Sequence, residues 1–333
     1  MKLGKLPNKY LSKLLAKIPE YDSRIALGAS LGEDAALVDM GGKYLIATTD
    51  PITFATDQIG WYAVNVNAND IATMGGIPKW MMANLLLPKN ITENDIENIF
   101  TQLIDACTEF NINLIGGHTE ITNTVNTPVL MGCMLGEVDK GKEIKSSGAI
   151  EEDSIIITKG IPIEGSAILA LERESLLLSK NISQKNIDAS KKLLKTPGIS
   201  IVRDAQVAIT TVQVHAMHDL TEGGLAQGLR EIAQASNLGM QIFQDKIPMV
   251  ECSKDFWISL DLNPLGVIAS GSLIICVKDE DTSNVIKSLN SHGIEASKIG
   301  NMKKRGYGIK ISSHGKDEDL PVFNQDEITK IFN

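Results

Sequence analysis

Acidic side chains at the ends of short apolar segments are the first residues in this sequence that could do chemistry. Asp34 lies in a glycine-containing turn of sequence GEDAA, and Asp50 closes an apolar segment that ends in TTD. Asn67 and Asp70 are three positions apart, so on a helix they share one face, one turn from each other. The surrounding stretch 64–72 is otherwise mostly apolar or small, so these polar groups occupy a region where a core face is expected.

Several carboxylates that converge in a protein interior repel one another unless a cation or protons compensate them. Mg²⁺ prefers oxygen ligands and is commonly held by a few carboxylates together with the phosphates of a substrate. Taken singly, Asp34 and Asp50 could be turn or cap residues, and Asp70 a polar residue on a helix face. Taken together, the three carboxylates favour a Mg²⁺ site.

A second candidate site is the sequence GGHTE at residues 116–120, which follows an apolar run typical of a buried strand. Paired glycines bring backbone N–H groups close to a ligand, and this suits phosphate oxygens. His118 could be a hydrogen-bonded structural histidine, a phosphate contact or an acid–base group. The sequence has neither a Walker A loop nor a GxGxxG turn between a strand and a helix, so it does not predict a P-loop or a dinucleotide-binding fold.

A third candidate site is HDLTEGGL at residues 218–225, expected to follow a strand and open a helix. Thr221 is a possible N-cap, and the two glycines allow a ligand to approach the helix N-terminus, where anions bind. Asp219 and Glu222 are candidates for proton transfer in the same segment. The alternative is an acidic cap on an ordinary helix.

The elements that must position these residues follow from apolar periodicity and capping signals. Thr92 and Asp95 form a capping-box signature, and a short amphipathic helix is predicted within the first 18 residues. In the first half, the pattern predicts strands at 35–39, 44–49, 79–87, 112–115 and 129–138 and helices at 57–75 and 92–107. In the second half, it predicts strands at 154–158, 212–217, 240–243, 273–277 and 308–311 and helices at 166–178, 183–194, 201–212 and 224–235.

Length and composition indicate a soluble protein of two α/β domains. A chain of 333 residues is long for one core, and the charged stretch 139–153 predicts a joint between domains 1–148 and 149–333. The net charge of −9 argues against a nucleic-acid partner. No apolar run approaches the roughly 18 residues of a membrane span, and the lysine-rich start lacks the apolar core of a signal peptide. We therefore expect a cytoplasmic protein with no membrane partner.

The four cysteines, at positions 107, 133, 252 and 276, are widely spaced and form no CxxC pair. Neither a zinc site nor a disulfide framework is expected from this spacing. Their neighbours are apolar or small, so the sequence predicts four buried cysteines that act as small hydrophobic residues.

Taken in order, these motifs resemble the aminoimidazole-ribonucleotide (AIR) synthase-related, or PurM-like, superfamily. This superfamily includes AIR synthase, thiamine-monophosphate kinase, selenophosphate synthetase and the carbamoyl dehydratase of hydrogenase maturation. The resemblance covers nearly the whole chain. It rests on GEDAA at 32–36, TD at 49–50, NDIATMGG at 69–76, GGHT at 116–119 and HDLTEGGL at 218–225, which stand in the family's order.

The resemblance implies an N-terminal mixed sheet that forms a barrel across a homodimer, and a C-terminal α/β sandwich. It also implies binding of ATP and Mg²⁺. Carried over, the metal ligands are Asp34, Asp50 and Asp70. The residues implied at the nucleotide are Asp50, Asn67, Asp70, Gly116, Gly117, His118, Thr119 and Glu120. The candidate catalytic residues are His118, Asp219 and Glu222.

Departures from individual members narrow the choice. The sequence ends in Asn333 without the terminal cysteine on which the carbamoyl dehydratase acts, and its first cysteine is Cys107, whereas selenophosphate synthetase uses a residue near the N-terminus. His118 stands where AIR synthase has an acidic residue. The sequence is therefore closest to the hydrogenase-maturation and AIR-synthase branches, with a substrate of its own.

We expect an ATP- and Mg²⁺-dependent enzyme: a ligase or cyclase, a dehydratase or a phosphotransferase. It would phosphorylate and activate a carbonyl or amide-type oxygen on a small molecule or a carrier-bound group. Two alternatives remain open at this point. One is a non-catalytic nucleotide-binding paralogue in a maturation complex, and the other is a small-molecule kinase of the thiamine-monophosphate kinase type.

Overall fold

The computed structural model describes residues 6, 8–19, 21–30, 32–52, 57–313 and 315–332. The chain divides into two compact units. The N-terminal unit comprises Pro19–Ser30 and Asp34–Glu143, and the C-terminal unit comprises Met1–Ile18, Leu31–Glu33 and Ile144–Asn333. Helix α1 (Asn8–Leu15) is the predicted N-terminal helix and is grouped with the C-terminal unit. The division at residues 148 and 149 stays a prediction.

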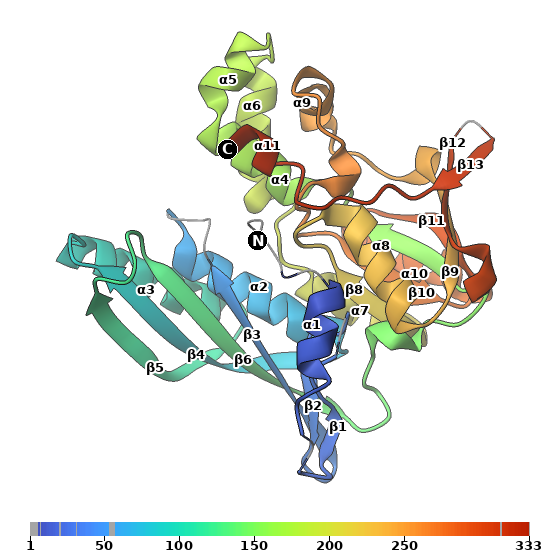
Figure 1. The fold of residues 1–333 in the computed structure, drawn as a ribbon, viewed down its shortest axis with the longest axis horizontal. Helices are drawn as coiled ribbons and strands as arrows, with labels where there is room; N and C mark the ends of the chain where they lie inside the picture. The colour runs from blue at the N-terminus through green and yellow to red at the C-terminus, as the bar shows by residue number, and fades with distance from the viewer. Residues whose placement is uncertain are drawn as a thin grey trace. The chain divides into compact units, whose positions relative to one another are not determined.

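Within the described residues, the N-terminal unit forms a six-stranded mixed sheet in the order β1-β2-β3-β6-β4-β5. β4 and β5 run parallel, whereas the other neighbouring strands run antiparallel. Two helices, α2 (Ile59–Thr73) and α3 (Glu93–Glu109), pack on one face of this sheet (Figure 1). The strands are β1 (Ile25–Leu27), β2 (Ala36–Asp39), β3 (Lys43–Ile52), β4 (Ile77–Pro88), β5 (Asn113–Thr122) and β6 (Val129–Asp139).

The two helices of this unit differ in how they are buried. α2 is buried on nearly all sides, so Asn67 and Asp70 lie in the core, as their apolar neighbourhood predicted. α3 is amphipathic, and its predicted capping box is confirmed: the Thr92 side chain accepts from the Asp95 N–H, and the Asp95 carboxylate accepts from the Thr92 N–H. α2 begins at Ile59, two residues after the predicted start.

Strand β5 corrects the prediction that residues 112–115 form a strand that ends at the glycine pair. The strand continues to Thr122, so residues 116–120 are part of the sheet. The reason is its partner: β4 runs parallel to β5 and pairs with it from Trp80↔Asn113 to Pro88↔Thr122. In sequence, a glycine pair usually indicates a turn. Here the neighbouring strand β4 supplies the hydrogen bonds that continue the ladder through both glycines.

Within the described residues, the C-terminal unit forms a seven-stranded mixed sheet in the order β13-β12-β9-β11-β7-β10-β8. β9 and β12 are parallel, and the other neighbouring strands are antiparallel. The predictions for 154–158 and 273–277 match β7 and β10, whereas β1, β11 and β13 were not predicted. The strands are β7 (Ser154–Thr158), β8 (Val214–Asp219), β9 (Gly239–Phe243), β10 (Leu273–Val277), β11 (Ala296–Lys303), β12 (Ile309–Ser313) and β13 (Lys316–Asp319).

The helices of this unit correct two further predictions. The helix predicted at 166–178 is two helices that meet at Arg173, whose backbone (φ −132°, ψ 28°) is not helical. The predicted N-cap Thr221 is replaced by Gly223, because the chain turns into α8 through a left-handed residue. The helices are α4 (Ile163–Glu172), α5 (Glu174–Ser179), α6 (Gln184–Lys191), α7 (Val202–Thr211), α8 (Gly224–Ala235), α9 (Lys254–Ser259), α10 (Thr282–Ser291) and α11 (Thr329–Phe332).

The main core of the C-terminal unit lies between α8 and the sheet, where Leu225 and Leu229 of α8 meet Ile155, Ile157 and Ile274. Helices α7 and α10 contact strands of the same sheet and each other. Separate apolar packing joins α4, α5, α6 and α9 around Phe256. The unit is therefore an α/β sandwich, as the resemblance implied.

Two of the four cysteines are buried as predicted. These are Cys107 and Cys276, whereas Cys133 and Cys252 are half-buried. Among the described residues, no helix has the length and apolar character that crossing a membrane requires.

Candidate functional site

Two of the predicted metal ligands, Asp34 and Asp70, meet at a single hydroxyl in the N-terminal unit. Thr48 Oγ1 lies 2.6 Å from Asp70 Oδ2 and 3.1 Å from the main-chain oxygen of Asp34. Asp70 is 6% exposed and Thr48 is 9% exposed. Three elements that are distant in sequence thus converge here: the turn before β2, strand β3 and helix α2.

The third predicted ligand, Asp50, belongs to the same arrangement. It lies two residues beyond Thr48 on β3, so the two side chains lie on the same side of the sheet. Its N–H donates to Asn67 Oδ1 at 3.1 Å, and Asn67 is one helical turn before Asp70. The structure therefore links the main chain of Asp50 to the helix that carries Asp70.

The donor set fits a hard divalent cation. Asp50 and Asp70 offer carboxylate oxygens on the side of the sheet that α2 covers, Asp34 lies next to Thr48 through its main-chain oxygen, and Asp70 sits where an uncompensated charge is unfavourable. Mg²⁺ takes oxygen ligands of this kind, keeps several waters and shares phosphate oxygens with a substrate. A Mg²⁺ held here would neutralise charge on a phosphoryl group.

The side chain of Asn67 was predicted to contact the nucleotide. It is fully buried: Oδ1 accepts from the Asp50 N–H, and Nδ2 donates to the main-chain oxygen of Ala63 at 2.8 Å. Direct contact with a nucleotide stays a prediction. The observed bonds join the Asn67 side chain to strand β3 and to its own helix.

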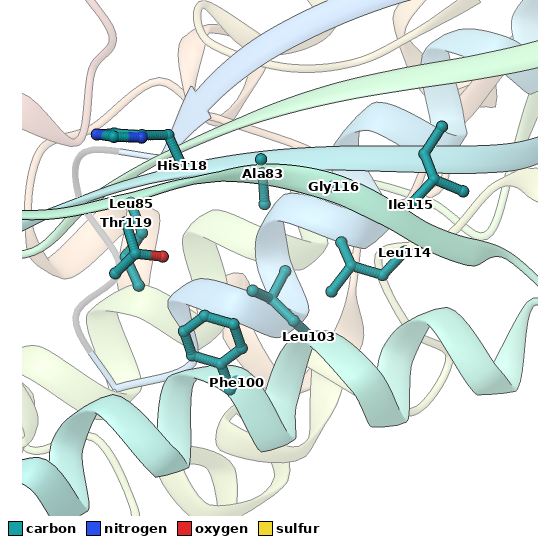
Figure 2. Close-up of a pocket in the computed structure, with 10 residues that line it drawn as sticks. Ala83, Leu85, Phe100, Leu103, Leu114, Ile115, Gly116, His118 and Thr119 are labelled. Atoms are coloured by element: carbon teal, nitrogen blue, oxygen red, sulfur yellow. The ribbon is translucent and has the colours of Figure 1, made fainter.

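Residues 116–119 of the GGHTE segment line a pocket of about 420 Å³ at the edge of the same sheet. Its apolar wall comes from α3 and from β4 and β5, through residues that include Phe100, Leu103, Leu114 and Leu85 (Figure 2). Ligand pockets of several hundred cubic ångströms with mostly apolar walls are typical of small-molecule sites. The pocket was not predicted, because residues 116–120 were expected to form a loop.

Within this segment, side chains alternate between the two faces of β5. Thr119 points toward Phe100, whereas the imidazole of His118 points to the opposite face of the sheet (Figure 2). The His118 side chain is 70% exposed, and its Nε2 lies 3.7 Å from Glu120 Oε2. His118 is thus an accessible imidazole beside a carboxylate rather than a buried structural histidine.

Gly117 must be glycine for a steric reason. Its φ is +147°, and a Cβ at this position would lie 1.9 Å from the main-chain oxygen of Ala83. The close approach of β4 and β5 at this point therefore depends on a residue without a side chain.

The two parts of this unit occupy one row of the sheet. Asp50 pairs with Gly132, Gly132 pairs with Ala83, and Ala83 pairs with Gly117. Three inter-strand spacings separate Asp50 from Gly117, which is about 14 Å. Asp50 and the predicted nucleotide segment are therefore related by sheet register, which the sequence alone does not reveal.

In the C-terminal unit, the histidine of the HDLTEGGL motif is tied to helix α8. His218 and Asp219 end strand β8 rather than following it, and they are 4% and 2% exposed. His218 Nε2 lies 3.0 Å from Glu231 Oε2, and Gln227 donates to the other Glu231 oxygen at 2.8 Å. This network fixes the orientation of the His218 ring.

The start of helix α8 already has a carboxylate at its N–H groups. Gly223 N–H donates to Asp326 Oδ2 at 2.8 Å. Burial raises the pKa of Asp326 to about 6, although backbone N–H groups that include that of Gly223 oppose the shift. The predicted anion site at this helix start is therefore partly filled by the protein itself.

One buried acidic residue near the start of α8 was not predicted from the sequence. Glu164, in the first turn of α4, is 6% exposed. Burial raises its pKa to about 7, and the nearby carboxylates of Glu222 and Asp326 add to the effect, while hydrogen bonds from Ser270 oppose it. In sequence, an acidic residue in a first helical turn is ordinary, so only its burial distinguishes Glu164.

Comparison with known proteins assigns the family. Residues 32–138 match the N-terminal domain of AIR synthase related proteins, and residues 151–311 match the C-terminal domain. A putative hydrogenase expression/formation protein of Methanocaldococcus jannaschii is 30% identical over 318 residues, covering 93% of this chain and 91% of the relative. The carbamoyl dehydratase HypE of Rhizobium leguminosarum is 29% identical over 283 residues, covering 81% of this chain and 77% of the relative.

Solved structures agree on the fold. A chain in the crystal structure of a HypE–HypF complex has a TM-score of 0.76 at 20% identity, covering 93% of this chain and 98% of that one. HypE in complex with ATP has a TM-score of 0.69 at 21% identity, covering 89% of each chain. The two mixed sheets and their order along the chain correspond to the PurM-like architecture. On these matches, the chain belongs to the AIR synthase related protein family.

Proposed function

We propose that this chain is an ATP- and Mg²⁺-dependent enzyme that phosphorylates, and so activates, a carbonyl or amide-type oxygen of a small molecule or a carrier-bound group. The observation that carries the proposal is the set of hydrogen bonds through Thr48 and Asn67, which join the main chain at Asp34 and Asp50 to the helix that carries Asp70. Relatives support the nucleotide: HypE has been solved with ATP. Phosphoryl transfer depends mainly on positioning and charge neutralisation, which an oxygen-rich site supplies.

Each part of the N-terminal unit has a role in this proposal. Asp34, Asp50 and Asp70 hold Mg²⁺, which would neutralise charge on the phosphates. Residues 116–120 contact the nucleotide, with Gly117 allowing the close approach of β4 and β5 beside them and the adjoining pocket accepting an apolar part of the ligand. His118, Asp219 and Glu222 remain the candidates for proton transfer to or from the acceptor.

The proposal is tested by calorimetric titration with a non-hydrolysable ATP analogue, with and without Mg²⁺. We expect Mg²⁺-dependent binding near one site per chain. Asp50→Asn and Asp70→Asn should each weaken binding at least about tenfold in Mg²⁺, because each removes a charged ligand. Asp105→Asn, an exposed carboxylate on α3, is the control and should bind like the unchanged protein. Unchanged Mg²⁺-dependent affinity in both ligand variants would show that the metal assignment is wrong.

The fate of the phosphate separates activation from simple kinase chemistry. With the acceptor present, ³¹P spectra should show ADP and free phosphate if the phosphorylated oxygen leaves. A stable phosphorylated organic product would instead identify a small-molecule kinase. If no acceptor supports ADP release while the ATP analogue still binds, the chain is a nucleotide-binding paralogue in a complex. Because a structural relative has been solved as a HypE–HypF complex, an acceptor delivered by a partner protein is the first class of acceptor to test.

We also propose that the chain is a homodimer joined through the N-terminal sheet. Helices α2 and α3 cover one face of this sheet, and the side chains that alternate toward the other face are largely apolar and half-buried or exposed. A second copy would cover this surface, which we name the open sheet face. Its apolar side chains are Leu45, Ala47, Met82, Leu86, Met131, Cys133 and Leu135, and Thr49 and Asn84 lie among them on the same face.

A further inference from the structure

Helix α2 has two buried asparagines that satisfy their amide groups in the same way. Asn65 is 2% exposed and Asn67 is 0% exposed. Each donates from Nδ2 to the main-chain oxygen four residues earlier, Asn65 to Trp61 at 2.9 Å and Asn67 to Ala63 at 2.8 Å. As helix residues the two are therefore closely matched.

They differ in what the side-chain oxygen does. Asn67 Oδ1 accepts from the N–H of Asp50 on strand β3. Asn67 is also one turn before Asp70, whose carboxylate is hydrogen-bonded to Thr48 on the same strand. Two hydrogen bonds thus hold α2 against β3: one joins the Asn67 side chain to the main chain of Asp50, and the other joins the Asp70 carboxylate to Thr48.

Strand β6 leaves space for the Asn67 side chain. Gly132 pairs with Asp50, and a Cβ at this glycine would lie 2.5 Å from Asn67 Nδ2. The main-chain oxygen of Gly132 also accepts from Thr49 Oγ1 at 2.7 Å. A side chain at position 132 would therefore push Asn67 away from Asp50.

We propose that Asn67 is a positioning residue that sets the distance between the Asp50 and Asp70 carboxylates and so tunes the site for Mg²⁺. This inference rests on the proposed function, in which both carboxylates bind the metal. Mg²⁺ demands near-ideal octahedral geometry at 2.0–2.1 Å, whereas Ca²⁺ accepts six to eight ligands at 2.3–2.6 Å. A shift of Asp50 by a few tenths of an ångström therefore affects Mg²⁺ more than Ca²⁺.

The test is a metal titration of the whole chain at a fixed concentration of the non-hydrolysable ATP analogue, first with Mg²⁺ and then with Ca²⁺. Asn67→Ala should raise the Mg²⁺ concentration for half-saturation by about 10–100-fold, the usual effect of removing a residue that orients a metal ligand. The Ca²⁺ midpoint should rise by a clearly smaller factor. Asn65→Ala removes the matching helix bond and should leave both midpoints within about twofold.

A second variant perturbs the same contact without changing Asn67. Gly132→Ala should reproduce the selective loss of Mg²⁺ because the new methyl group displaces the Asn67 amide. It keeps the test available if Asn67→Ala does not fold. Melting temperatures of all variants separate a loss of stability from a change in metal preference.

The outcomes separate this inference from the function on which it rests. If Asp50→Asn weakens Mg²⁺-dependent binding but Asn67→Ala and Gly132→Ala behave like Asn65→Ala, the positioning role is wrong and the metal site stands. Equal losses for Mg²⁺ and Ca²⁺ also overturn it. If Asp50→Asn leaves the Mg²⁺ midpoint unchanged, the metal site fails, and the positioning role fails with it.

Discussion

At the scale of single residues, burial separates carboxylates that share one local sequence pattern. Glu164 lies in the first turn of helix α4 and Glu172 is its last residue, but Glu164 is buried and Glu172 is exposed. Burial disfavours the charged form, so the pKa of Glu164 rises to about 7. The folded protein consequently holds a proton at Glu164 that the unfolded chain releases near pH 4.5.

A pH-dependent stability follows for Glu164. Because the native state binds this proton more tightly, its contribution to the free energy of unfolding is largest below about pH 4.5, falls from pH 4.5 to about 7, and is constant above. Glu164→Gln should remove this decline and stabilise the protein above pH 7 by at most about 3 kcal/mol. Urea unfolding from pH 4.5 to 8 checks this.

Glu172→Gln is the matched control and should retain the slope of the unchanged protein. Asp326, with a pKa of about 6, contributes a decline of the same sign, so some slope should persist in Glu164→Gln. A slope equal to that of the unchanged protein in Glu164→Gln would contradict the assignment.

At the scale of elements, pairing between strands decides the conformation of the GGHTE segment. Two adjacent glycines normally predict a turn, but β4 offers a partner along the whole length of β5. The two glycines are not equivalent in this pairing. A Cβ at Gly116 would meet nothing within 4 Å, whereas one at Gly117 would collide with Ala83.

Alanine substitutions should expose this difference. Gly117→Ala should destabilise the protein by about 3 kcal/mol, because the methyl group forces β4 and β5 apart and the backbone is held at a positive φ. It should also weaken binding of the ATP analogue. Gly116→Ala should change the free energy of unfolding by less than about 1 kcal/mol. Equal effects of the two substitutions in chemical denaturation would contradict the close approach at Gly117.

At the scale of the whole molecule, the open sheet face is an apolar surface that helices α2 and α3 do not cover. Its side chains come from three adjacent strands, so they form a continuous surface rather than scattered exposed residues. Contiguous apolar surface of this kind marks a binding face. A second copy of the same sheet is the partner we propose.

The proposed dimer should respond to a charge on this surface. Light scattering should give a mass near twice the 36.0 kDa of the chain. Met82→Asp, at an open-face residue that is 37% exposed, should weaken association at least about tenfold, since a buried unpaired charge costs well over 1.4 kcal/mol. Ile104→Asp, at a 52% exposed residue of α3, should leave the mass unchanged. A monomeric unchanged protein at micromolar concentration would contradict the proposal.

The sequence by itself determined the features that depend on neighbours along the chain. Strands 154–158 and 273–277, helix 224–235 and the capping box of Thr92 and Asp95 were predicted from local pattern and are confirmed. The ordered motifs also identified the family, because motif spacing is a property of the chain itself. The placement of Asn67 and Asp70 in a core followed from their apolar surroundings.

Only the tertiary structure decided the features that depend on partners distant in sequence. The continuation of β5 needs β4, the raised pKa of Glu164 depends on its burial and on the charges of Glu222 and Asp326, and the bond from Asn67 needs Asp50. Contacts of this kind produce no periodicity or capping signal in the sequence, because each residue involved would also be acceptable at an ordinary surface position. The hydrogen bonds that join β3 to α2 beside Asp50 and Asp70, on which the proposed chemistry rests, are therefore a property of the fold.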